Sequence, residues 1–281
     1  MKGRINMYKT IELTPDYKAV GVSSRDCKAT LQMIAPNNND EMGKRKRRAI
    51  VIVPGGGYEF VSEREAEPVA LKFAGAGFAA FILRYSVYKK KFPTALLELA
   101  AAVKYIRDNA EELDIDRDKV TVMGFSAGGH LAACLANMWN SSTITYALCC
   151  KAEDIKVNCS VLCYPVLTSG EKTHEGSILN LIGEEQDKEL REYLSLEDRV
   201  GKHTPPTFLW HCADDGCVPI ENTLYYMDSL TKNKIPFEAH IYPFGGHGLS
   251  LANKNTATDP WHTVPECERW ADMAIEFINR F

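Results

Sequence analysis

A serine suited to nucleophilic chemistry lies near the middle of the chain. Residues 124–128 read GFSAG and match the pattern G-x-S-x-G, in which a serine hydroxyl is exposed at a sharp turn from a strand into a helix. A β-branched segment, Lys119 to Met123, precedes the pattern, and a helical segment, Leu131 to Trp139, follows it. Because the backbone is crowded at such a turn, the positions two before and two after the serine must be very small, and both are glycine. We therefore expect Ser126 to attack a carbonyl carbon, and a plain glycine-rich turn is the alternative.

A serine hydroxyl needs a general base and a carboxylate that orients the base, and later segments supply both. His247 stands between glycines in residues 245–248, GGHG, directly after the last predicted strand, so its ring can turn back over the sheet. The other histidines are expected to be structural or exposed. Asp214 and Asp215 both occupy the loop after the preceding strand; we favour Asp215 as the acid and keep Asp214 as the alternative. The order Ser, Asp, His along the chain is that of α/β-hydrolases.

A second glycine-rich loop is suited to stabilising the negative charge of such an attack. Residues 55–57, GGG, follow the predicted strand Ala49 to Val53. Without a Cβ, glycine lets backbone N–H groups approach a ligand closely, and each N–H aimed at a developing oxyanion contributes roughly 100- to 1000-fold in rate. We expect Gly56, Gly57 and Ala127 to form an oxyanion hole. The loop lacks the GK[ST] of a phosphate-binding loop, and an ordinary turn stays an alternative.

Segments of β and helical periodicity alternate along the chain, which predicts an α/β fold with a mostly parallel central sheet and helices on both faces. The predicted strands are Tyr8 to Leu13, Lys28 to Ile34, Ala49 to Val53, Gly77 to Tyr85, Lys119 to Met123, Val157 to Tyr164, Thr207 to His211 and Phe237 to Tyr242. The predicted helices are Arg64 to Ala74, Thr94 to Leu113, Leu131 to Trp139, Ile220 to Lys232 and Trp261 to Phe281.

One polar segment, from about Thr168 to Thr204, interrupts this alternation. It joins two predicted strands at more length than a simple crossover needs. We expect a helical, cap-like insertion (residues 168–204) over one end of the sheet, with a long surface connection as the alternative. Because one active site built from Gly56, Ser126, Asp215 and His247 requires one continuous sheet, we expect a single domain over residues 1–281.

Composition places the chain among globular proteins that bury a sizeable core. Of its 281 residues, 45% are hydrophobic and 25% are charged, and the net charge is −4. This charge excludes the strongly basic surface of a protein that binds nucleic acid or an anionic membrane. The longest apolar run, Phe73 to Leu83, is too short to cross a bilayer. The N-terminal residues MKGRINMYKT lack the apolar core of a signal peptide, so we expect a cytoplasmic protein without a membrane partner.

Two further groups of residues are not expected to form a site. Nine cysteines are scattered without a CxxC pair or a histidine pair at zinc-finger spacing, so we expect reduced thiols, no metal and no organic cofactor. Residues 44–48, KRKRR, flank a predicted buried strand. We interpret them as the solvated approach to the sheet, which limits aggregation, and a nucleic-acid or nuclear-import patch is the alternative.

Several motifs together resemble a known family. They are PGGGY, SEREAEPVA, LRYSV, GFSAGGHLAA, PPTFLWHCADDGCVP and IYPFGGHGLS. Through them, residues 48–281 resemble α/β-hydrolases of the esterase/lipase family, most closely acetyl xylan esterase-like enzymes (carbohydrate acetyl esterases), which are often found beside xylan-degrading enzymes. Pro54 replaces the histidine of lipases with an HGGG loop, which argues against a generic lipase of that type.

This resemblance implies an α/β-hydrolase fold, and it carries the family's site residues over to matching positions. These positions are Ser126, Asp215 and His247 for the triad, and Gly56 and Gly57 for the oxyanion loop.

The residues and the resemblance together predict a serine carboxylic-ester hydrolase that works through an acyl-enzyme intermediate. From the resemblance alone, we expect a small-molecule ester as partner, an acetylated xylo-oligosaccharide or similar sugar, and a role in carbohydrate metabolism and xylan degradation. A short-chain aryl or alkyl carboxylesterase is the main alternative. A prolyl-oligopeptidase-like peptidase and a non-catalytic binding protein on a hydrolase scaffold are less favoured. The sequence leaves a homo-oligomer open.

Overall fold

The computed structural model describes residues 8–41, 43–88, 90–185 and 187–281. Residues 1–7, which belong to the N-terminal stretch that lacks a signal-peptide pattern, lie outside these residues. Within them, an eight-stranded sheet has the order β1-β2-β4-β3-β5-β6-β7-β8. Its strands are β1 (Tyr8–Glu12), β2 (Thr30–Ile34), β3 (Arg47–Val53), β4 (Ala79–Arg84), β5 (Ile115–Phe125), β6 (Cys159–Cys163), β7 (Thr207–Cys212) and β8 (Phe237–Tyr242). The β1–β2 and β2–β4 pairs are antiparallel, and the other neighbouring pairs are parallel.

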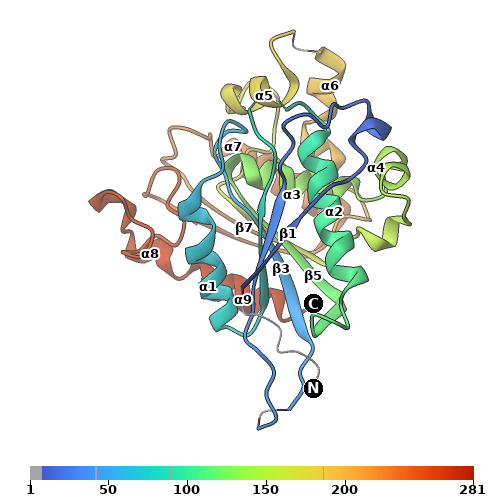
Figure 1. The fold of residues 1–281 in the computed structure, drawn as a ribbon. Helices are drawn as coiled ribbons and strands as arrows, with labels where there is room; N and C mark the ends of the chain where they lie inside the picture. The colour runs from blue at the N-terminus through green and yellow to red at the C-terminus, as the bar shows by residue number, and fades with distance from the viewer. Residues whose placement is uncertain (1–7, 42, 89, 186) are drawn as a thin grey trace.

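Helices cover both faces of this sheet, as the alternation of segments predicts (Figure 1). The α-helices are α1 (Glu67–Gly75), α2 (Thr94–Asp108), α3 (Ser126–Met138), α4 (Ser142–Ala147), α5 (Glu175–Ile182), α6 (Lys188–Tyr193), α7 (Glu221–Asn233), α8 (Pro265–Glu268) and α9 (Trp270–Ile278). Side chains of α2, α3 and α7 join the hydrophobic core on one face, and those of α1 and α9 join the core on the other. The fold is therefore the α/β class expected from the sequence.

Strand β3 illustrates how the sheet separates the two cores. Ala49, Val51 and Val53 belong to one core, whereas Ile50 and Ile52 belong to the other, and all five are fully buried. Successive side chains of a strand point to opposite faces. A continuous apolar run is therefore what a strand buried on both faces requires.

The predicted helix Thr94 to Leu113 is wrong at its C-terminal end. Helix α2 ends at Asp108, because Asn109, with φ −105° and ψ 15°, leaves the helical conformation; its side-chain amide and its backbone N–H both donate to the carbonyl of Tyr105, at 2.8 and 3.1 Å.

The predicted final helix, Trp261 to Phe281, is also wrong, because this segment is broken into pieces. A 3₁₀ turn, Pro260–His262, precedes α8 and α9. Pro265 has no backbone N–H and disfavours a helical conformation at the residue before it, so the helix cannot run through this point. Val264 is accordingly extended, with φ −123° and ψ 96°.

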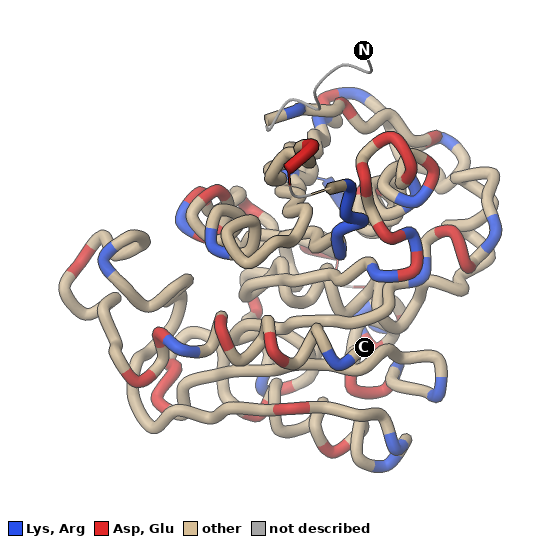
Figure 2. The backbone as a smooth tube through the Cα atoms, turned by 90° about the horizontal axis from the view of Figure 1, so that it is seen from below, with Lys and Arg blue, Asp and Glu red and all other residues tan. Residues whose placement is uncertain are grey.

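Charged residues of both signs are interspersed along the described backbone (Figure 2). Residues of the basic run KRKRR have partners nearby: Lys46 forms an ion pair with Glu111, Arg47 donates to the carbonyl of Pro36 at 3.1 Å, and Arg48 donates to that of Asn279 at 3.4 Å. These contacts tie the run to the protein at the start of β3. No helix in the described part of the chain is long and apolar enough to span a membrane.

Candidate active site

The turn between β5 and α3 holds Ser126 in a strained backbone conformation. Ser126 has φ +52°, which a residue with a side chain adopts only when its surroundings enforce it. A Cβ on Gly124 would lie 2.1 Å from the carbonyl oxygen of Gly128, and a Cβ on Gly128 would lie 2.2 Å from that of Val53. Both positions therefore require glycine, as the motif predicts. The turn leaves Ser126 at the N-terminus of α3, where the helix dipole favours negative charge.

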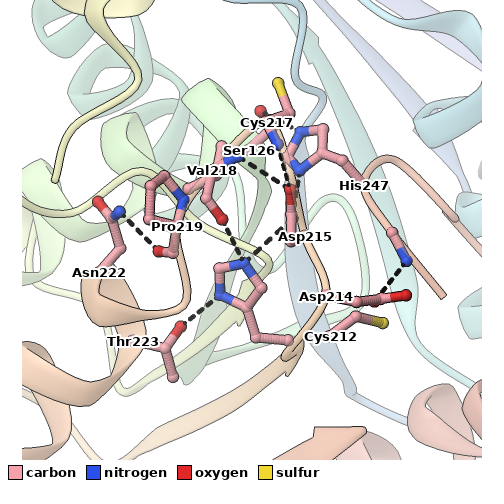
Figure 3. Close-up of polar contacts among 12 residues, drawn as sticks. Ser126, Cys212, Asp214, Asp215, Cys217, Val218, Pro219, Asn222, Thr223 and His247 are labelled. Carbon is pink, nitrogen blue, oxygen red and sulfur yellow. Dashed lines mark hydrogen bonds and ion pairs between the residues drawn. The ribbon is translucent and has the colours of Figure 1, made fainter. Parts of the chain in front are cut away.

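Ser126, His247 and Asp215 form one hydrogen-bonded row (Figure 3). The Ser126 Oγ lies 2.9 Å from His247 Nε2, and His247 Nδ1 lies 2.6 Å from Asp215 Oδ2. The carboxylate can only accept, so His247 donates from Nδ1 and is left with Nε2 as an acceptor for the serine hydroxyl proton. The structure thus brings together the three side chains that the sequence analysis selects.

Asp215, and not Asp214, contacts His247. Besides the histidine, Asp215 accepts the backbone N–H groups of Cys217 and Val218, both at 2.9 Å. Burial by itself would raise the pKa of Asp215, but the hydrogen bonds from His211, His247 and Val218 and the charge of His247 outweigh it and hold the pKa well below its usual value. The carboxylate is therefore ionised at neutral pH.

Asp214 holds the loop that carries the histidine. Its carboxylate accepts the N–H groups of Gly245 at 3.2 Å and Gly246 at 2.9 Å. Because these are the two residues immediately before His247, Asp214 ties its own loop, after β7, to the loop that carries His247.

His211, expected to be structural or exposed, is a second buried partner of Asp215. Its Nε2 lies 3.1 Å from both Asp215 Oδ2 and the carbonyl of Val218, and its Nδ1 lies 2.8 Å from Thr223 Oγ1. His211 therefore helps to hold the Asp215 carboxylate and is more than an isolated core residue. The sequence signal that could have revealed it is the spacing of four between His211 and Asp215.

His174 lies closer to the site than its position in a polar insertion predicts. It accepts the backbone N–H of Ser177 and so caps α5. Burial and, after it, the charge of His247 lower the pKa of His174.

The predicted oxyanion loop lies beside Ser126. A Cβ on Gly55 would be 3.0 Å from the Ser126 Cβ, and Gly56 and Gly57 have φ values of +124° and +64° that favour glycine. Among the hydrogen bonds between described residues, none uses the N–H of Gly56 or Gly57 as donor. The N–H of Ala127 lies in the first turn of α3, where backbone N–H groups have no carbonyl acceptor within the helix. In the part of the chain described, no group of three or more His, Cys, Asp or Glu side chains is placed to hold a metal ion.

Comparison with known proteins assigns this chain to a family. The BD-FAE family matches residues 33–230. The chain belongs to the BD-FAE family.

Solved structures match this BD-FAE member along almost its whole length. An acetyl ester-xyloside bifunctional hydrolase from Caldicellulosiruptor lactoaceticus is 32% identical with a TM-score of 0.82, over 97% of this chain and 96% of that one. A sugar hydrolase from Lactococcus lactis is 32% identical with a TM-score of 0.77, over 97% of this chain and 98% of that one. These matches confirm the α/β-hydrolase fold and the resemblance to esterases of the acetyl xylan esterase-like group.

Curated relatives are longer than this chain. Endo-1,4-beta-xylanase B of Butyrivibrio fibrisolvens is 37% identical over 77% of this chain and 34% of its own length. An acetylxylan esterase of Xylanibacter ruminicola is 29% identical over 89% of this chain and 50% of its own length. The chain thus spans about a third to a half of these relatives. By family and fold it groups with ester hydrolases.

Proposed function

We propose that this chain is a serine carboxylic-ester hydrolase in which Ser126 is the nucleophile, His247 the general base and Asp215 the orienting acid. The observation that carries the proposal is the unbroken row of hydrogen bonds from Ser126 Oγ through His247 to Asp215. The strained turn at Ser126 and the family membership support the same reaction.

The proposed reaction proceeds in two acyl transfers. Ser126 Oγ bonds to the ester carbonyl carbon while its proton passes to His247 Nε2, and Asp215 stabilises the imidazolium. The N–H groups of Gly56, Gly57 and Ala127 bind the oxyanion. His247 then protonates the leaving alcohol as the C–O bond breaks. Water attacks the acyl-enzyme by the same route, releasing the carboxylic acid and regenerating Ser126.

We also propose that residues 168–204 cap this site within a single domain, residues 1–281. Helices α5 and α6 of this segment lie at the upper end of the molecule in Figure 1. The side-chain amide of Asn180, on α5, donates to the carbonyl of Gly57 at 2.9 Å. The cap therefore supports the oxyanion loop directly.

The first test replaces the nucleophile. Ser126→Ala should fold normally and reduce p-nitrophenyl acetate hydrolysis to near background, because no other hydroxyl occupies the end of the row. Circular dichroism checks the fold. A folded variant with undiminished turnover would contradict the proposal.

For the substrate, we propose an acetylated xylo-oligosaccharide or a similar sugar ester, supported by the names of the relatives. The enzyme should deacetylate acetylated xylo-oligosaccharides and hydrolyse p-nitrophenyl acetate much faster than the butyrate and octanoate. Acetate release and kcat/KM measure this preference. Preference for the short-chain p-nitrophenyl esters with no activity on the sugars would instead indicate a short-chain carboxylesterase, and equal activity on the long acyl chains would contradict the acetyl-ester proposal.

A further inference from the structure

A buried carboxylate outside the proposed triad lies behind the oxyanion loop. Glu65, in the 3₁₀ turn Glu63–Glu65 before α1, is only 4% exposed. Its Oε2 accepts the N–H of Gly55 at 2.8 Å, and its Oε1 accepts the hydroxyl of Tyr164 at 2.7 Å. None of the ion pairs between described residues pairs Glu65 with a lysine or arginine. A buried carboxylate is costly to desolvate, so a purely space-filling role would be met better by an apolar side chain.

Gly55 connects this carboxylate to the nucleophile. A Cβ on Gly55 would lie 2.8 Å from the carbonyl oxygen of Phe125, 2.9 Å from Glu65 Oε2 and 3.0 Å from the Ser126 Cβ. Gly55 therefore packs closely against both Glu65 and Ser126. Because Gly56 follows Gly55 directly, the bond from Glu65 to Gly55 sets where the next N–H groups of the loop can point.

Tyr164 connects the same carboxylate to the base. Its hydroxyl oxygen also accepts the N–H of Ser250 at 2.9 Å, three residues after His247. Its ring packs edge-on against the His247 imidazole, with centroids 5.0 Å apart and planes at 70°. Ser250 Oγ in turn donates to the carbonyl of Arg64 at 2.6 Å, next to Glu65, which closes the network.

We propose that Glu65 is a positioning residue that fixes the oxyanion loop through Gly55, and the base loop through Tyr164 and Ser250, relative to Ser126. This inference rests on the proposed function. The two donors that meet Glu65 explain why the residue is a glutamate. A carboxylate offers two acceptor oxygens, whereas a glutamine offers one acceptor and an NH₂ donor. In Glu65→Gln, the single side-chain oxygen can accept only one of these donors. The variant therefore keeps the shape of the side chain but either leaves the Gly55 N–H facing an NH₂ group or reverses the bond with the Tyr164 hydroxyl and loses the negative charge.

The test compares Glu65→Gln with Glu67→Gln, the same change at an exposed position two residues away. In p-nitrophenyl acetate hydrolysis, we expect Glu65→Gln to lower kcat by about 10- to 100-fold, since one misaligned donor loses part of the roughly 100- to 1000-fold that it supplies. KM should change less than about threefold, because the oxyanion forms only in the transition state. Inhibition by an aryl trifluoromethyl ketone, which forms a tetrahedral adduct with the serine, should weaken by the same factor as kcat. Glu67→Gln should match the wild type.

Tyr164→Phe provides a second variant should Glu65→Gln fail to fold. It removes the hydroxyl but retains the ring against His247, and we expect kcat to fall with KM unchanged.

The proposal would be overturned by a folded Glu65→Gln with wild-type kcat and wild-type inhibition by the trifluoromethyl ketone. If Glu65→Gln does not fold, wild-type kcat in Tyr164→Phe would overturn it. A lowered melting temperature with normal kcat would also overturn it. Ser126→Ala separates the two proposals: activity in that variant contradicts the proposed function, whereas its loss alongside a fully active Glu65→Gln contradicts the positioning role alone.

Discussion

Asp214 and Asp215 follow one another in the chain, yet their carboxylates bind different partners. Asp215 accepts from His247 and His211, whereas Asp214 accepts from the backbone of the loop that precedes His247. The first contact acts on the protonation and orientation of the imidazole, and the second acts on the position of the loop. At the residue scale, the two carboxylates should therefore contribute unequally to the reaction.

Asp215→Asn should reduce kcat for p-nitrophenyl acetate by roughly 1000- to 10,000-fold, because an amide can donate to Nδ1 and stabilise the wrong imidazole tautomer. Asp214→Asn should cost about tenfold or less, because one oxygen acceptor for the loop N–H groups remains. Steady-state kinetics on both variants at one pH measures the difference. A greater loss in Asp214→Asn than in Asp215→Asn would reverse the assignment.

At the scale of elements, the junction of β5 and α3 is the most tightly specified part of the fold. Gly128 stands against the carbonyls of Val53 and Pro54, so α3 packs directly on the end of β3. Backbone atoms of a central strand cannot move aside without breaking its pairing. The glycine is therefore required by packing between elements, in addition to the turn itself.

Gly128→Ala should destabilise the protein by about 3 kcal/mol or more, because its Cβ would overlap backbone oxygens. Gly75→Ala, at the end of α1, is the matched control. A Cβ there meets nothing within 4 Å, and the change should fall within about 1 kcal/mol of the wild type on the stabilising side. Urea unfolding measures both. Equal stability of the two variants would refute the packing argument.

At the scale of the whole molecule, His130 links three distant segments. From α3, its Nε2 lies 3.1 Å from the carbonyl of Leu194 in the insertion, and its Nδ1 lies 2.8 Å from the hydroxyl of Tyr58, after the oxyanion loop. Burial lowers the pKa of His130 to about 4. The neutral ring therefore belongs to the folded state, and its protonation should loosen the insertion from the sheet.

The free energy of unfolding should consequently depend on pH through His130. In the unfolded chain, His130 binds a proton below its pKa of about 6.5, whereas in the folded protein it does not bind one until about pH 4. The free energy of unfolding therefore decreases as the pH falls from 6.5 to 4, by roughly 3 kcal/mol in total. Above pH 6.5 this contribution is constant. Urea unfolding of the wild type and of His130→Gln between pH 4.5 and 7.5 tests it. Parallel pH profiles for the two proteins would contradict the prediction.

Much of the fold is predictable because its signals are local. Continuous apolar runs bounded by glycine and proline predict β3, β4 and β7 to within a few residues. Signals that compete within one segment are harder to interpret. The last helical pattern contains Pro265, and α2 ends where the backbone of Asn109 leaves the helical conformation.

By itself, the sequence determined which chemistry this protein could support. A nucleophile turn requires glycine at Gly124 and Gly128 because of backbone geometry within a few residues, and such a requirement is visible in the chain. Only the tertiary structure decided which of two adjacent aspartates reaches His247, because that depends on how the loop after β7 folds around the N–H groups of Cys217 and Val218. It likewise decided that Glu65 meets both Gly55, 10 residues away, and Tyr164, 99 residues away, since a contact across 99 residues of chain leaves no local pattern.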